Sequence, residues 1–274
     1  MADQAIAAGG VTLAVSDDGE GIPVVLLHGL TASRRYVVMG SNGLQRAGHR
    51  VVAYDARGHG ASSPAAAPSQ YRYEDLVADL AAVLDALGID RAVLAGASMG
   101  AHTILRLALD APERVAAVAV ITPGYDPVDI DDPERLARWD ALSDALREGG
   151  IDGFVEAYGV QRLPARWRDT IATVLRQRMG LHEHPDAVAD ALRATPRSRP
   201  FADLHALEQI ECPAVVVASR DEADPGHPLA LGEAYAELLP DARLLVEEPG
   251  ASPLAWQGGR LSKAIAALAA RADV

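Results

Sequence analysis

The sequence is short of cysteine and of aromatic residues. Cys212 is the only cysteine among 274 residues, so no disulfide can form within the chain. Such a composition is typical of proteins from a reducing compartment. Aromatic residues make up only 4% of the chain, whereas hydrophobic residues as a whole make up 49%. A chain of this length can bury a large core, and that core must be built mainly from Ala, Val, Leu and Ile.

Positive charge is also scarce. The chain has 25 Lys and Arg residues against 38 Asp and Glu residues, which gives a formal net charge of −13. A chain with this balance repels phosphate, and no basic cluster stands out. The sequence therefore argues against nucleic acid and anionic membranes as partners. Solubility is the simplest reason for the excess of negative charge.

Long apolar segments are missing as well. The first residues, Met1 to Gln4, are not a basic region followed by an apolar run, so we expect no signal peptide. The apolar run 115–121 is far shorter than the roughly 20 residues that cross a bilayer. Together with the single cysteine, these features lead us to expect a cytoplasmic protein.

What the sequence does have is an alternation of short apolar runs with stretches of helical periodicity. This alternation is typical of a mostly parallel sheet with helices on both faces. The expected strands are 11–15, at an edge, and then 23–28, 50–55, 92–97, 115–122, 215–219 and 243–247. The expected helices of this core are 73–87, 100–109 and 261–270.

The strand rhythm stops between Pro123 and about Pro200 and resumes at Pro213. Helical patterns fill the interruption, at 132–148, 153–158, 167–179 and 186–194. Because neither flanking part could complete a sheet alone, we interpret 124–200 as a helical cap inserted into one α/β core. That core is formed by 1–123 and 201–274.

One pentapeptide, Gly96-Ala97-Ser98-Met99-Gly100, joins an expected strand to an expected helix. In so tight a turn, side chains at the two glycine positions would collide with neighbouring backbone. Ser98 is then held at the tip of a strained turn with its hydroxyl exposed, which suits a nucleophile. The amino end of the next helix points toward the same place and favours a developing negative charge.

A nucleophile that attacks a carbonyl also needs donors for the oxyanion. The backbone N–H of Met99, the residue after the nucleophile, is one expected donor. The second is expected from the loop after the strand that ends at His28-Gly29, and the N–H of Leu30 is the candidate. We expect His28 itself to be structural, because the turn it occupies aims the amide.

Three segments resemble, in order, the motifs of the α/β-hydrolase family. They are Leu26-Leu27-His28-Gly29-Leu30, Asp55-Ala56-Arg57-Gly58-His59-Gly60-Ala61-Ser62 and the pentapeptide around Ser98. Pro213-Ala214-Val215-Val216-Val217 resembles a later strand of that family, so the match spans nearly the whole chain. The resemblance implies an eight-stranded, mostly parallel sheet and an activity of the esterase, lactonase, thioesterase or C–C hydrolase kind. It implies neither cofactor nor metal, and it gives His59 a structural place.

The family's catalytic acid follows the strand after the cap. Here that loop reads Ser219-Arg220-Asp221-Glu222-Ala223-Asp224-Pro225-Gly226-His227-Pro228. Asp224 matches best, because an Asp-Pro step with a second proline after it resembles the family's turn. Asp221 stays open as an alternative, since the loop is longer than usual. A turn-forming role for Asp224 is the ordinary structural reading.

The family's catalytic base is a histidine in the loop after the last strand, and here it is missing. Ser252 stands at the expected place, and no histidine follows His227. A serine cannot take a proton from Ser98 near neutral pH. Loss of a triad base costs several orders of magnitude in rate.

Other histidines could replace the missing base. His227 is the first candidate, because it lies three residues after Asp224 in a loop that should border the site. His182 and His184 lie in the cap, and His102 lies one helical turn after Ser98. The structural readings are a turn or surface residue for His227, solvated residues at a helix start for the cap pair, and a buried residue for His102.

The sequence leaves three functions open. The first is a serine hydrolase of small, partly hydrophobic carboxylic esters, thioesters or lactones with a relocated base. The second is a non-hydrolytic enzyme, of lyase, isomerase or cyclase type, that uses only the oxyanion donors. The third is a ligand-binding protein that kept the pocket and lost turnover. In each case we expect Gly29, Tyr125 and Trp256 to contact the small molecule. The oligomeric state stays open.

Overall fold

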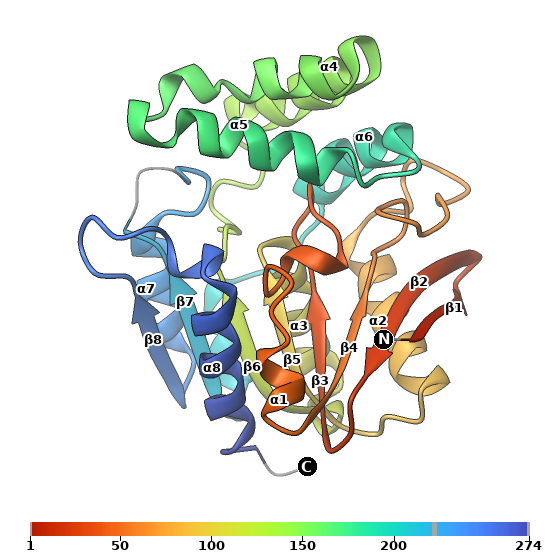
Figure 1. The fold of residues 1–274 in the computed structure, drawn as a ribbon, viewed down its shortest axis with the longest axis vertical. Helices are drawn as coiled ribbons and strands as arrows, with labels where there is room; N and C mark the ends of the chain where they lie inside the picture. Colours follow the sequence, from red (N-terminus) through yellow and green to blue (C-terminus); the bar gives the residue numbers. More distant parts are fainter. Residues whose placement is uncertain (1, 221–223, 273–274) are drawn as a thin grey trace.

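An eight-stranded sheet forms the centre of the molecule in the computed structural model, which describes residues 2–220 and 224–272 (Figure 1). The strand order is β1-β2-β4-β3-β5-β6-β7-β8. Only the pairs β1–β2 and β2–β4 are antiparallel, and every other pair is parallel. This confirms the predicted mostly parallel α/β fold. The strands are Ala2–Ala8, Val11–Asp18, Ile22–Leu27, His49–Tyr54, Ala92–Ala97, Val115–Ile121, Ala214–Ala218 and Ala242–Val246.

The strand β1 was not predicted. It pairs with β2 along its whole length across the Gly9-Gly10 turn. Only Ile6 and Ala8 among its described side chains are buried. An edge strand that is rich in alanine and exposes most of its side chains carries little hydrophobic periodicity, so the sequence pattern does not reveal it.

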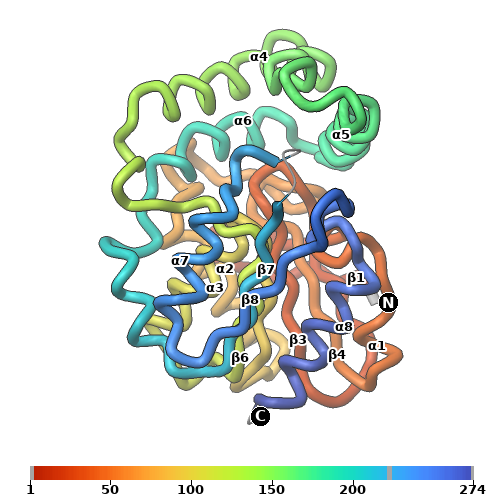
Figure 2. The backbone as a smooth tube through the Cα atoms, turned by 90° about the vertical axis from the view of Figure 1, so that its left-hand side faces the viewer, coloured from red at the N-terminus to blue at the C-terminus, as the bar shows by residue number. Residues whose placement is uncertain are grey.

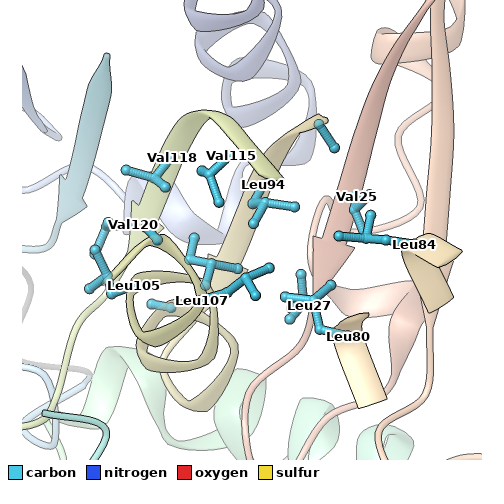
Figure 3. Packing of buried hydrophobic residues seen from close by; sticks show 14 of the residues in the cluster. Val25, Leu27, Leu80, Leu84, Leu94, Leu105, Leu107, Val115, Val118 and Val120 are labelled. Carbon is cyan, nitrogen blue, oxygen red and sulfur yellow. The ribbon is translucent and has the colours of Figure 1, made fainter. Parts of the chain in front are cut away.

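Helices cover both faces of the sheet. On one face lie α2 (Tyr73–Ala86), α3 (Met99–Asp110) and α7 (Leu229–Leu238); α7 was not predicted. Figure 3 shows how valines and leucines of the strands pack against α2 and α3 there. On the other face lie α1 (Gly43–Arg46) and α8 (Gly258–Ala269). Because successive strand residues face opposite sides, the same strands supply both cores.

A helical insertion follows β6 and lies over the carboxyl edge of the sheet (Figures 1 and 2). It consists of α4 (Pro133–Tyr158), α5 (Ala165–Met179) and α6 (Pro185–Ala194). Gly150 interrupts α4 with φ 60° and ψ −148°, which accounts for the two separate helices expected there. The limits of the cap at 124 and 200 stay predictions. Short 3₁₀ helices occur at Arg34–Tyr36, Pro112–Arg114, Val160–Arg162, Thr195–Arg197, Leu204–Gln209 and Leu254–Trp256.

The cap has an apolar core of its own that continues onto the sheet domain. Phe154, Val188 and Leu192 are fully buried in it, and Leu30, after β3, and Met99, the first residue of α3, belong to the same cluster. The two expected oxyanion residues are thus packed directly under the cap. In the part of the chain that the structure describes, no helix is both long and apolar enough to span a membrane.

Candidate active site

Ser98 occupies a strained turn between β5 and α3. Its backbone has φ 49° and ψ −110°, a conformation that side chains other than glycine rarely adopt. A Cβ atom added at Gly96 would lie 2.3 Å from the carbonyl carbon of Gly100, and one added at Gly100 would lie 2.4 Å from the Leu27 carbonyl oxygen. The turn therefore closes only because both positions are glycine, as the sequence pattern predicted.

His227 bridges Ser98 and Asp224. Its Nε2 lies 2.8 Å from Ser98 Oγ, and its Nδ1 lies 2.8 Å from Asp224 Oδ2. With Nδ1–H donating to the carboxylate, Nε2 carries a lone pair and accepts a hydrogen bond from the Ser98 hydroxyl. The structure thus brings together the three residues for which sequence reasoning proposed nucleophile, base and acid. Asp221, the alternative acid, lies outside the described residues.

The loop around His227 is shaped by its own backbone and by a glycine after β6. The His227 N–H donates to the Asp224 carbonyl at 3.1 Å, which turns the imidazole back over the carboxylate. A Cβ atom on Gly124 would lie 2.9 Å from His227 Cδ2 and 3.3 Å from its Nε2. Any larger residue at position 124 would push the imidazole away from Ser98. The sequence pattern did not single out Gly124.

His227 and Asp224 shift each other's pKa values in opposite directions. Burial lowers the pKa of His227, but the charge and hydrogen bond of Asp224 outweigh it, so the pKa lies above its ordinary value. Burial raises the pKa of Asp224, yet His227 and Arg178 together hold it below its usual range. Asp224 therefore stays ionised and favours the proton on His227.

Two residues that line the same cavity as Ser98 have backbone N–H groups without a hydrogen-bond partner among the described residues. Neither the Leu30 N–H nor the Met99 N–H donates a hydrogen bond to any described residue. Gly29 lies close to Ser98, since a Cβ atom added to it would be 3.5 Å from Ser98 Cβ. His59 Nε2 contacts the Leu30 carbonyl oxygen at 2.7 Å and so holds the Leu30 peptide in place.

The other histidines near the site have structural contacts. His28 Nε2 accepts from the Ala56 N–H at 2.9 Å, and its Nδ1 lies 2.8 Å from the Gly29 carbonyl oxygen. His102 Nε2 accepts from the Gly124 N–H at 3.1 Å, and its Nδ1 lies 2.8 Å from the Tyr73 hydroxyl. Burial lowers the pKa of His102 to about 3, so it is neutral. Both of its nitrogens are engaged away from Ser98.

The two cap histidines also lie elsewhere. His182 is buried, and its Nδ1 accepts from the Gly60 N–H at 2.9 Å. His184 is the residue before the first turn of α6. Among the described residues, neither has a hydrogen bond to Ser98.

The loop after β8 contains Ser252 and Trp256. The Ser252 carbonyl oxygen accepts from Gln257 Nε2 at 2.6 Å. Trp256 makes an edge-to-face contact with Trp167 of α5, with ring centroids 5.6 Å apart. The buried carboxylate of Glu247 joins this loop to the one after β7, since it accepts from Ser219 Oγ at 2.8 Å and from the Leu254 N–H at 3.2 Å.

A small cavity of about 50 Å³ opens beside Ser98. Tyr125 lines it, as do Leu30 and Met99, whereas Gly29 and Trp256 are not among its lining residues. Sequence reasoning missed several lining side chains, because they come from α2, from α4 and from the segment after α6. These are Tyr73, Arg135, Trp139, Thr195, Pro196 and Ser198.

No cluster of His, Cys, Asp and Glu side chains within residues 2–220 and 224–272 is placed to hold a metal ion. The arrangement at Ser98 consists of a hydroxyl, an imidazole, a carboxylate and two backbone N–H groups without a partner among the described residues. Such a set can add a hydroxyl to a carbonyl and stabilise the resulting oxyanion.

Comparison with known proteins agrees with this geometry. The sequence model of the alpha/beta hydrolase fold matches residues 22–257. The chain belongs to the α/β-hydrolase fold family. The match begins at β3 and ends in the segment after β8, so it includes Ser98, the cap and the loop of His227.

Individual relatives of this α/β-hydrolase are themselves named as hydrolases. RutD of Variovorax paradoxus, named as a carbamate hydrolase, is 32% identical over 76% of this chain and 77% of its own. A thermophilic esterase from Thermogutta terrifontis is 26% identical with a TM-score of 0.79, covering 97% of both chains. An N-acyl homoserine lactone degrading enzyme is 27% identical with a TM-score of 0.74, covering 97% of this chain and 98% of its own. The present chain is an enzyme of the same fold.

Proposed function

We propose that this α/β-hydrolase cleaves small carboxylic esters, thioesters or lactones by way of an acyl-enzyme on Ser98. The observation that carries the proposal is the position of His227, with 2.8 Å from Nε2 to Ser98 Oγ and 2.8 Å from Nδ1 to Asp224 Oδ2. Hydrogen-bond reach between nucleophile and base, and between base and carboxylate, is what such chemistry requires.

In the proposed mechanism Ser98 Oγ attacks the substrate carbonyl carbon while His227 Nε2 takes the hydroxyl proton. The Leu30 and Met99 amides hold the negative oxygen, and Asp224 stabilises the imidazolium. When the tetrahedral intermediate collapses, His227 returns the proton to the leaving oxygen or sulfur. Water then attacks the acyl-enzyme with His227 again as base, which releases the carboxylic acid and restores Ser98.

The names of the relatives support this class of substrate. A carbamate, an ester and a lactone share a carbonyl carbon bonded to a heteroatom that can leave. The alternatives of a non-hydrolytic enzyme and of a binding protein rested on the absence of a histidine near position 252. With His227 within reach of Ser98, no observation favours either alternative over hydrolysis.

Labelling with a fluorophosphonate tests the proposal, because the probe reacts with an activated serine and loses fluoride. We expect wild type to be labelled on Ser98, Ser98→Ala to be unlabelled, and Ser252→Ala, in the neighbouring loop, to be labelled like wild type. Mass spectrometry of the labelled peptide identifies the site. Absence of labelling in wild type, under conditions that fully label a control esterase, would contradict the proposal.

A further inference from the structure

One residue that lines the cavity beside Ser98 is positively charged. It is Arg135, from the first turn of α4. Its Nη1 donates to the Pro196 carbonyl at 3.0 Å and to the Ile130 carbonyl at 3.4 Å. Its Nε and Nη2 donate to no described residue, and no described carboxylate lies within 4.0 Å of it. Two N–H-bearing nitrogens of a permanent cation are therefore available at the wall of the site.

Four other arginines of the cap have an acidic partner. Arg147, Arg193, Arg197 and Arg199 each form an ion pair with an aspartate at the surface. Asp132, three residues before Arg135, instead accepts from the N–H groups of Glu134 and Arg135 at the start of α4. A half-buried cation without an anion is costly, so a site that keeps one is suited to a ligand that supplies the anion.

The position of the base tells which part of a substrate reaches Arg135. His227 gives its proton to the leaving group, so the leaving group must lie on the side of His227. His227 is not among the residues that line the small cavity, whereas Ser98, Leu30 and Met99 are. The acyl part therefore enters the cavity, with its carbonyl between Ser98 and the two amides and its far end toward Arg135.

We infer that the preferred substrates carry an anionic group, such as a carboxylate, at the end of a short acyl chain. This inference rests on the proposed function. A cavity of about 50 Å³ limits the acyl chain to a few carbons. Trp139 and Met99 supply apolar walls along that chain, and Arg135 forms a charge-assisted hydrogen bond with the terminal carboxylate. Monoesters of short dicarboxylic acids have this chemistry.

Two p-nitrophenyl esters, the hemiglutarate and the pentanoate, test the inference. Their acyl chains have the same number of carbons, but only the hemiglutarate ends in a carboxylate. The quantity to compare is the ratio of their kcat/KM values. We expect wild type to favour the hemiglutarate, and Arg135→Gln to lower the ratio by about 10- to 100-fold, whatever the substitution does to both rates together, because a hydrogen bond to a charged group is lost. Arg135→Lys should recover part of the ratio.

Arg138→Gln is the matched control, since Arg138 lies on the same helix and is exposed. It removes the same charge and should leave the ratio as in wild type. If wild type cleaves the pentanoate through Ser98 but the ratio is unchanged in Arg135→Gln, the inference is wrong and the proposed function stands. An equal fall of the ratio in Arg138→Gln would also overturn it, since the effect would then be long-range charge alone.

If wild type cleaves neither ester, fluorophosphonate labelling still decides the proposed function, and binding decides the anion site. Calorimetric titration with glutarate should then give a dissociation constant at least about tenfold weaker for Arg135→Gln than for wild type and for Arg138→Gln. Equal binding by all three proteins would overturn the inference.

Discussion

The loops after β7 and after β8 lie at the same edge of the sheet but carry very different chemistry. The first contains Asp224 and His227, which connect to Ser98 through two hydrogen bonds of 2.8 Å. The second contains Ser252, at the place where the family pattern leads one to expect the base, and its buried carboxylate, Glu247, accepts hydrogen bonds that tie the two loops together. The comparison teaches that a candidate base is better chosen by its distance from the Ser98 hydroxyl than by its place in the chain.

The loop after β7 can place the His227 imidazole beside Ser98 because a neighbouring segment, after β6, leaves space for the ring. Gly124 follows β6, and a Cβ atom there would come within 2.9 Å of the His227 ring. The Gly124 N–H donates to His102 Nε2, so a neutral, buried histidine fixes the backbone that makes this space. Asp224, from the same short loop, orients the ring. The position of the His227 ring thus depends on the segment after β6, through Gly124, and on α3, through His102.

The largest expected effect comes from removing the imidazole. His227→Gln should lower kcat for an ester substrate by on the order of 10⁴- to 10⁶-fold, because Ser98 then has no proton acceptor. Steady-state kinetics measure the loss, and the melting temperature of the variant reports whether it folds. His184→Gln, in the cap, is the control and should retain wild-type kcat. A His227→Gln variant with most of the wild-type rate would break the comparison, since another residue would then be the base.

A smaller effect is expected on the acid limb of the pH profile. In the proposed mechanism only neutral His227 can take the Ser98 proton, so kcat/KM should rise as pH rises through the pKa of His227. Because burial lowers this pKa but Asp224 raises it more, the midpoint should lie above the ordinary value of about 6.5. In Asp224→Asn, where kcat should fall by about 10⁴-fold, titration of His227 followed by NMR should show a lower pKa than in wild type. An unchanged pKa would mean that Asp224 does not act on the imidazole.

The smallest effect is expected in the second loop. Ser252→His restores the residue of the family pattern, yet we expect kcat/KM to change by no more than about twofold, the size of a surface substitution worth roughly 0.5 kcal/mol. The reason is that His227 already occupies the hydrogen-bond position at Ser98 Oγ. Measuring kcat/KM for an ester substrate with Ser252→His and with wild type checks this prediction. A gain of an order of magnitude would show that His227 is an inefficient base or none.

Much of the core could be predicted because its signals are local. Buried parallel strands are continuous apolar runs, and the elbow at Ser98 needs glycine at fixed positions for steric reasons. Helix breaks behave in the same way, as Gly150 shows within α4. By contrast, β1 and α7 were missed, since their side chains carry too weak a periodicity to separate an edge element from a loop.

The cavity could not be predicted to the same extent. Tyr73, Arg135 and Ser198 come from separate parts of the chain and meet beside Ser98 only when the cap lies on the sheet. Arg135 and Arg138 lie three residues apart on the same helix, and nothing in a helical pattern distinguishes an arginine that lines a cavity from one in solvent. The free N–H groups of Arg135 are a property of its surroundings.

The sequence by itself determined the α/β architecture, the position of Ser98 and the absence of a histidine where the family pattern has one. It also named His227 and Asp224 as candidates, because they lie near each other in one loop. Only the tertiary structure decided which histidine reaches Ser98, since a hydrogen bond of 2.8 Å depends on how β6, β7 and α3 are packed and on the space beside Gly124. Local steric rules can be read along a chain, but distances between remote side chains are set by packing alone.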